Sequence, residues 1–174
     1  MKAPKLTAID VELAIADHFG YRVNQIVPNI GWGLFGNREV DIFIVRPSGW
    51  GDEVEIKVSA SDIRADLHKR HGHIHPLISR TWFAVPRGIA TADIPEHFGI
   101  LEVWQTTDHG LQTWVKEIRV PKRDKFARKL SEAQIAQVCR LATMRIWTLK
   151  KHLHYQLEQR RYREGNETTK RAGV

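Results

Sequence analysis

The chain has 174 residues, 42% of them hydrophobic, which is enough to bury one core and predicts a single domain with an appendage. Its single cysteine, Cys139, excludes an internal disulfide, and the acidic residues within the apolar N-terminal stretch exclude a secretory signal peptide. No apolar run approaches the length that spans a bilayer, so we expect a soluble, cytoplasmic protein without a membrane partner.

The net charge of +7 is unevenly distributed along the chain. Residues 1–115 carry 11 Lys and Arg against 14 Asp and Glu, whereas residues 116–174 carry 16 against 6. The last third is therefore strongly basic and follows a slightly acidic body. Such a segment indicates a polyanionic partner such as nucleic acid, although a solvated basic tail has the same composition.

The first predicted element is a helix over 7–19, with Thr7 as N-cap, Asp10 as the acidic half of a capping box and Gly20 as the stop. Glu12 falls in the middle of its predicted apolar face, where an unpaired charge is costly. We expect Glu12 to face a metal, a partner or a solvated cleft; the alternative is a core-edge carboxylate that reaches water. The residues assigned to the apolar face are Ala8, Ile9, Ile15, Ala16 and Phe19.

A strand is predicted over 21–27, ended by Pro28. The glycines of GWGLFG, residues 31–36, match the G-x-G-x-x-G fingerprint of dinucleotide-binding proteins, but they lead into a strand where that motif requires a helix. We therefore interpret this stretch as a turn or the wall of a cleft. Strands over 38–46 and 53–58, joined by PSGWGD, are predicted to form an antiparallel hairpin.

The remaining elements follow from the same periodicities and turn signals. A helix is expected from Ser59 or Ser61 to His71, and a short helix over 92–98. Strands are expected over 80–86, 100–105 and 111–118. VPKRDK reads as a linker, and Ser131 with Gln134 forms a capping box for a helix to Arg163. We expect the last ten residues of the chain to be disordered.

Charged residues occupy unusual places on these predicted strands. Asp41 interrupts an apolar strand, and Glu55 and Lys57 point to the same side of the next strand. Cross-strand pairing is expected to bring Asp41 and Glu55 together on one face. These two carboxylates and the backbone carbonyl of Ile56 make an all-oxygen metal site, which suits Mg²⁺ or Mn²⁺.

The neighbouring charges complete a hydrolytic site. Glu12 is predicted to hold a second metal or a metal-bound water, and Lys57 to orient the attacking water or stabilise the developing phosphate charge. Phosphodiester hydrolysis needs this set of groups. The structural alternative is an ion pair between Glu55 and Lys57, because the E-x-K triplet alone is common.

In this order, Glu12, Val40-Asp41 and Glu55-Ile56-Lys57 resemble the PD-(D/E)xK nuclease superfamily, in which the first residue of the PD pair is the less constant one. Within it, VEIKVSASDIRADLHKRHGHIHPLISRTWFAVP is similar to the MmcB-like bacterial DNA-repair proteins, and the resemblance covers roughly residues 7–105. The chain departs from that family at Val58, where Ser is usual, and in the histidine-rich HKRHGHIH. The matching residues are Glu55, Lys57, Ser59, Asp62, Asp66 and 83–86.

The resemblance implies an α/β restriction-endonuclease-like core, of order αβββαβ with a mixed sheet flanked by helices, over residues 1–118. A basic linker and a long C-terminal helix are expected over 119–174. The implied function is a Mg²⁺-dependent deoxyribonuclease of repair or recombination, with Glu12, Asp41, Glu55 and Lys57 as catalytic residues. The alternative is a non-catalytic nucleic-acid-binding protein that uses the same fold.

Basic side chains are predicted to contact phosphates. Near the cleft these are Arg64, Lys69, Arg70 and His73, and on the C-terminal helix they are Arg140, Lys150, Lys151, Arg160 and Arg161. Asp66 is expected to pair with Arg70, one turn further along its helix. We expect the apolar stripe of the C-terminal helix to pack on the core or on a second copy of the chain. A homodimer formed through this helix is therefore one of the alternatives. The cluster His68, His71, His73 and His75 lacks a nearby cysteine, which disfavours a zinc site.

Overall fold

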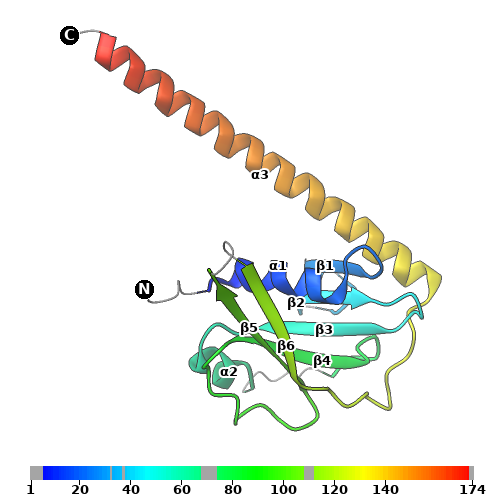
Figure 1. The fold of residues 1–174 in the computed structure, drawn as a ribbon. Helices are drawn as coiled ribbons and strands as arrows, with labels where there is room; N and C mark the ends of the chain where they lie inside the picture. The colour runs from blue at the N-terminus through cyan, green and yellow to red at the C-terminus, as the bar shows by residue number, and fades with distance from the viewer. Residues whose placement is uncertain (1–5, 32, 37, 68–73, 108–111, 173–174) are drawn as a thin grey trace. The chain divides into compact units, whose positions relative to one another are not determined.

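The computed structural model describes residues 6–31, 33–36, 38–67, 74–107 and 112–172, without the side chains of Leu67 and residues 165–172. Within these residues the helices are α1 (Ala8–Phe19), α2 (Ala60–Leu67) and α3 (Glu132–Ala172) (Figure 1). The strands are β1 (Gln25–Ile30), β2 (Val40–Val45), β3 (Gly51–Ile56), β4 (Arg80–Pro86), β5 (Gly99–Thr106) and β6 (Gln112–Arg119). The chain divides into two compact units, of which the first ends at Ala136 and the second comprises the rest of α3.

The strands form one six-stranded sheet in chain order, from β1 to β6. β1, β2 and β3 pair antiparallel, β3, β4 and β5 pair parallel, and β6 returns antiparallel to β5. Figure 1 shows these strands side by side. An α/β domain with a mixed sheet flanked by helices was predicted, and the structure confirms that class.

The two faces of the sheet are covered by different helices, because alternate strand residues point to opposite sides. On one face, strand residues such as Ile42, Val54 and Leu101 pack against Val11 and Ile15 of α1. On the other face, Phe83, Val85 and Ile100 pack against Ile63 of α2 and against Ile94 and Phe98. By the same alternation, positions 41, 53 and 55 lie on the α2 face.

The predicted limits of α1 are confirmed, but its predicted apolar face is confirmed only at Ile15 and Phe19. Thr7 and Asp10 form the capping box, and Gly20 ends the helix with φ 70°. The buried residues are Val11, Ala14, Ile15 and Phe19, whereas Ile9 is 62% exposed. Aliphatic side chains occur on both sides of this helix, so periodicity alone included the exposed Ala8 and Ile9 and left out the buried Val11 and Ala14.

Two prolines also act differently from the sequence prediction. β1 continues through Pro28, which pairs with Ile42, because β1 is an edge strand and tolerates a residue without an amide hydrogen. The helix predicted over 92–98 is replaced by two turns, in which Ile94 N–H donates to Thr91 O at 3.0 Å and Phe98 N–H to Pro95 O at 3.1 Å. Pro95 disfavours the helical conformation at Ile94.

The segment 120–131, which begins with the predicted linker VPKRDK, is hydrogen-bonded to the rest of the first unit. Asp124 N–H donates to Ser79 O at 2.9 Å, and Leu130 N–H donates to Gly49 O at 2.9 Å. The compact unit therefore extends to Ala136, beyond the boundary predicted after residue 118.

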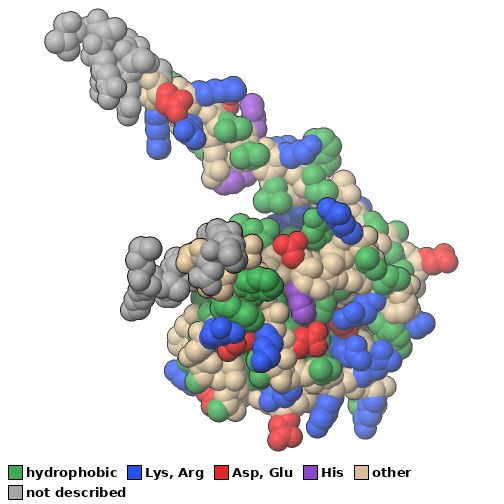
Figure 2. Space-filling view, in the orientation of Figure 1, with side chains coloured by type: hydrophobic (Ala, Val, Ile, Leu, Met, Phe, Trp, Pro, Cys, Tyr) green, Lys and Arg blue, Asp and Glu red, His purple; other side chains and the backbone are tan. Residues whose placement is uncertain are grey.

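The Ser131–Gln134 capping box is present at the start of α3, with Gln134 N–H donating to Ser131 Oγ at 3.3 Å. No proline follows this start, and the helix continues to Ala172, through most of the tail that was expected to be disordered. Figure 2 shows Lys and Arg side chains along α3 with hydrophobic ones between them. No helix within the described residues is long and apolar enough to cross a membrane.

Gly51 opens β3 at a point with no room for a side chain. A Cβ there would meet the carbonyl oxygen of Leu77 and the ring of Phe43. We expect Gly51→Ala to lower the free energy of unfolding by about 2 kcal/mol or more, the usual cost of overpacking a core. Urea denaturation measures the loss. Ser48→Ala, in the exposed turn before β3, is the control, and equal stability of the two variants would contradict the prediction.

Candidate functional site

Asp41 and Glu55 meet on the α2 face of the sheet. The register pairs Ile42 with Val54 and Phe43 with Glu53, so one further step places Asp41 opposite Glu55. The carboxylate Oδ2 of Asp41 accepts a hydrogen bond from the backbone N–H of Ile56 at 2.8 Å. The side chain of Asp41 is 39% exposed and that of Glu55 only 4%. The structure thus brings together two residues that the sequence pattern placed in one site.

Lys57 follows β3 directly and points toward three carboxylates. Its Nζ lies 2.7 Å from Glu55 Oε2, 3.1 Å from Asp66 Oδ1 and 4.0 Å from Asp41 Oδ2. Its backbone N–H donates to Ala84 O at 3.0 Å, which extends the parallel pairing with β4. The ammonium group is therefore held by residues of β2, β3 and α2.

Lys57 remains protonated at neutral pH. Burial acts to lower the pKa of Lys57, but the charges of Glu55, Asp66 and Asp41 and the hydrogen bond to Glu55 outweigh it and raise that pKa. The accompanying stabilisation is present at neutral pH and is lost only as the pH rises through the pKa of folded Lys57. At neutral pH the side chain can therefore act as a fixed positive charge and not as a general base.

A second cation, Arg38, lies before β2. It forms an ion pair with Glu53 and approaches Glu55 Oε1 to 3.7 Å. Thr81 Oγ1 donates a hydrogen bond to Glu53 Oε2 at 3.2 Å, so the fully buried Glu53 is bound from two sides. Burial lowers the pKa of Arg38, against the charges of Glu55, Asp66 and Asp41, yet a guanidinium keeps its proton at any physiological pH.

We define the ion cluster as Arg38, Asp41, Glu53, Glu55, Lys57 and Asp66. Among the described residues it brings together four carboxylates and two cations, a formal charge of −2 that favours a divalent cation. No three His, Cys, Asp or Glu side chains in the described ranges are grouped so as to hold a metal. A metal would thus depend on Asp41 and Glu55 with carbonyl and water oxygens, a donor set that fits Mg²⁺. The Ile56 carbonyl remains a predicted ligand.

Other predicted site residues lie elsewhere or outside the described residues. Glu12 is partly buried on α1, which covers the opposite face of the sheet, and its catalytic role remains a prediction. Arg64 is exposed on α2, 3.9 Å from Asp93 Oδ2. His75 is described: its Nδ1 accepts from Leu77 N–H at 3.2 Å, and burial with the charges of Arg38 and Arg128 lowers its pKa. Lys69, Arg70, His73, His68 and His71 lie outside the described residues.

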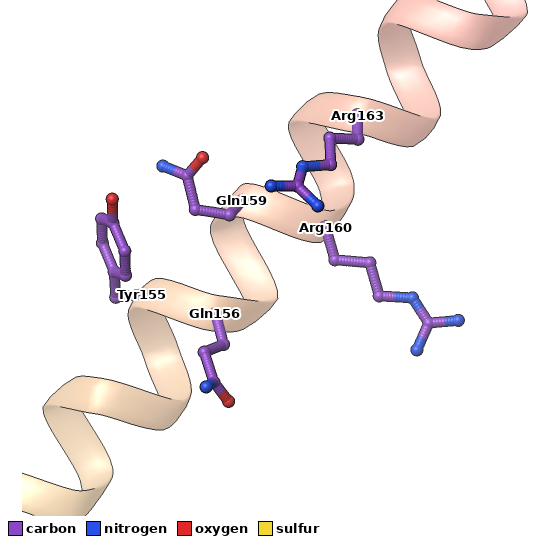
Figure 3. Close-up of a pocket in the computed structure, with 5 residues that line it drawn as sticks. All are labelled: Tyr155, Gln156, Gln159, Arg160 and Arg163. Carbon is purple, nitrogen blue, oxygen red and sulfur yellow. The ribbon is translucent and has the colours of Figure 1, made fainter.

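The predicted phosphate contacts of the C-terminal helix lie in the second unit and are exposed; they are Arg140, Lys150, Lys151, Arg160 and Arg161. Arg160 also pairs with Glu164 at 2.8 Å, and Arg161 with Glu158 at 3.1 Å. The hollow in Figure 3 is lined by Tyr155, Gln156, Gln159, Arg160 and Arg163, all from this one helix. It is a helix surface and not an enclosed site.

Three members of the ion cluster were not predicted as site residues. Glu53 shares a strand face with Glu55, two positions away, and this spacing was a usable signal. Asp66 lies one helical turn after the buried Ile63, which indicates that it faces the sheet, whereas it had been expected to pair with Arg70. Arg38 carried no such signal, because its partners become neighbours only in the folded sheet.

Loss of Lys57 leaves Glu55 and Asp66 buried without this cation. We expect Lys57→Met to lower the free energy of unfolding at neutral pH by about 3 kcal/mol or more. Urea denaturation at neutral pH measures the loss. The double variant Lys57→Met with Asp66→Leu should lose less unfolding free energy than the sum of the losses of the two single variants. Strictly additive losses would contradict a coupling between Lys57 and Asp66.

Comparison with known proteins supports the fold alone. No protein-family model matches the chain, and no curated protein matches it significantly. Among solved structures, the SPO1766 protein of unknown function from Silicibacter pomeroyi superposes with a TM-score of 0.61 at 17% sequence identity. The match covers 88% of this chain and 94% of that one. The chain therefore shares its fold with that protein over most of its length.

Proposed function

We propose that the protein is a metal-dependent nuclease that hydrolyses DNA phosphodiester bonds, with a restriction-endonuclease-like core. The observation that carries the proposal is the meeting of Asp41, Glu55 and Lys57 at the ends of two neighbouring strands. Lys57 Nζ lies 2.7 Å from Glu55 and 4.0 Å from Asp41. These are the residues through which the sequence resembles the PD-(D/E)xK nucleases.

The topology also supports the proposal. The elements α1, β1, β2, β3, α2 and β4 follow the expected αβββαβ order, with an antiparallel meander that passes into a parallel pair through α2. This connection places α2 next to the end of β3, and Asp66, in the last turn of α2, lies 3.1 Å from Lys57 Nζ. Ligands of open α/β sheets commonly bind at the carboxyl ends of such strands.

Asp41 and Glu55 are the side chains that would hold Mg²⁺ or Mn²⁺. Asp41 is partly exposed, and the hydrogen bond from Ile56 N–H fixes the direction of its carboxylate. The bound ion would supply Lewis-acid polarisation of the phosphate and a more acidic water. Lys57 is oriented by its carboxylate partners and keeps its proton, so its part is to stabilise negative charge that develops on the phosphate.

A non-catalytic nucleic-acid-binding protein is the second candidate function. The side chains of Glu55 and Lys57 are only 4% and 8% exposed and bind each other directly. Such burial also suits a structural ion pair, which needs no substrate. The two functions differ in what a conservative change at Asp41 should do.

Asp41→Asn keeps an oxygen acceptor for Ile56 N–H and removes the negative charge. We expect the variant to fold, to lose Mn²⁺ binding in a calorimetric titration, and to cleave labelled DNA at least about 100-fold more slowly with Mg²⁺, the scale of losing a preorganised electrostatic group. Asp62→Asn, on the exposed first turn of α2, is the matched control and should retain both properties. Unchanged metal binding and cleavage in Asp41→Asn would remove Asp41 from the site.

The basic residues of α3 should carry part of the electrostatic affinity for DNA. The double variant Lys150→Glu with Lys151→Glu reverses the charge of two of these residues and should weaken DNA binding. If both lysines contact phosphates, the slope of log K against log salt should fall by about 2. The control is Lys122→Glu with Lys125→Glu, an equal charge change at exposed positions of the 120–131 segment. Fluorescence anisotropy over a range of salt concentrations measures the slope. Equal slopes for the two double variants would show that no specific α3 contact exists.

A further inference from the structure

A pair of tryptophans lies on the surface of β5 and β6. Trp104 and Trp114 are direct cross-strand partners in the antiparallel register. Trp114 is 49% exposed, and its Nε1 donates a hydrogen bond to Thr106 Oγ1 at 3.2 Å. This bond fixes the direction of an indole ring that the core does not enclose.

A cation completes this surface. The Arg87 guanidinium carbon lies 3.7 Å from the centroid of the Trp104 ring, and Arg87 Nε donates to Glu102 Oε2 at 2.9 Å. The side chain of Arg87 remains half-exposed. We name Arg87, Trp104 and Trp114 the tryptophan platform. It presents the exposed ring of Trp114 beside a planar cation that stacks on Trp104.

The tryptophan platform shares a sheet face with the ion cluster. Leu101 and Val103 pack against the α1 side, so Trp104 points to the α2 side by alternation. In the strand register Glu55 of β3 pairs with Phe83 of β4, and Phe83 pairs with Ile100 of β5. Trp104 lies four residues after Ile100 on the same strand. At about 3.3 Å per residue and 4.8 Å per strand, the platform lies roughly 16 Å from Glu55. About five stacked nucleotides of one strand cover that distance.

The strip between the ion cluster and the tryptophan platform is covered by α2 and by Ile94 and Phe98. Ile63 packs there on Phe83, and the Arg64 side chain of the same helix is 58% exposed and lies 3.9 Å from Asp93 Oδ2. A nucleic-acid strand that joins the two surfaces would cross this helix, and a phosphate contact from Arg64 suits such a path.

We propose that the tryptophan platform binds unpaired bases, so that the substrate class is single-stranded nucleic acid or an unpaired end; this rests on the proposed nuclease function. Indole rings stack on any base, and an arginine beside them adds a contact for base or phosphate. Bases inside a duplex are already stacked on one another and cannot reach these rings. β6 is also an edge strand, which makes a second copy of the chain the competing occupant.

Trp114→Leu and Trp114→Phe separate stacking from bulk, because both keep an apolar side chain and only Phe keeps an aromatic face. Binding is measured by fluorescence anisotropy with one labelled strand, alone and annealed to its complement, in EDTA so that no cleavage occurs. We expect Trp114→Leu to weaken single-strand binding about tenfold or more and Trp114→Phe to restore most of it. Duplex binding should stay unchanged. Phe126→Leu, at an exposed aromatic residue outside the platform, is the control.

The proposal that the tryptophan platform binds unpaired bases is rejected if Trp114→Leu binds single-stranded DNA as tightly as the wild type does. It is also rejected if Trp114→Leu loses the same affinity for single strand and duplex. Sedimentation velocity is run on the same variants. A dimer that dissociates in Trp114→Leu while DNA affinity is kept would assign the surface to a second copy instead. The binding measurement depends on neither cleavage nor metal. If Asp41→Asn leaves cleavage unchanged while Trp114→Leu weakens single-strand binding, the proposed nuclease site is rejected and the single-strand binding site is retained.

Discussion

The contact of the Lys57 ammonium group with the carboxylates of Glu55 and Asp66 holds together the end of β3 and the inner face of α2. A buried charge is tolerated only when it has partners, so each of these side chains restricts where the others can lie. The hydrogen bond from Ile56 N–H to Asp41 extends the same restriction to β2. Arg38 and Glu53 add a second ion pair beside the first. The relative placement of two strands and one helix therefore depends on electrostatics as well as on apolar packing.

Local interactions of the fold were predictable from the sequence, and choices that depend on tertiary context were not. The Thr7–Asp10 and Ser131–Gln134 capping boxes involve residues three positions apart, and both are present. The strand over 80–86 alternates over its own length and has the predicted limits. The continuation of β1 through Pro28 was not predictable, because it depends on the position of β1 at the edge of the sheet. The buried side of α1 depended on where the sheet lies, which its many aliphatic residues did not indicate.

The same distinction holds for the candidate site. Asp41, Glu55 and Lys57 follow from two-residue alternation and one hairpin register, both of which can be read along the chain. Asp66 reaches Lys57 only because α2 folds back over the sheet, and Arg38 reaches Glu53 only because the β2–β3 pairing brings it there. Glu12 shows the reverse case: its position in the sequence suggested the site, and its helix covers the other face.

The order of the sheet has a consequence for how the molecule assembles during synthesis. Every strand pairs with its neighbour in the sequence, so contacts are largely between nearby segments, which favours rapid folding over topologies with distant pairings. The charged residues from Arg38 to Asp66 span a short stretch, and β2, β3 and α2 are complete before β5 is translated. Arg87, Trp104 and Trp114 come later in the chain. Domains generally fold as units, and Leu101 and Val103 of β5 share one core cluster with Ile42 of β2 and Val54 of β3. The strands of the ion cluster therefore complete their core only when the later strands, which carry the tryptophans, have joined the sheet.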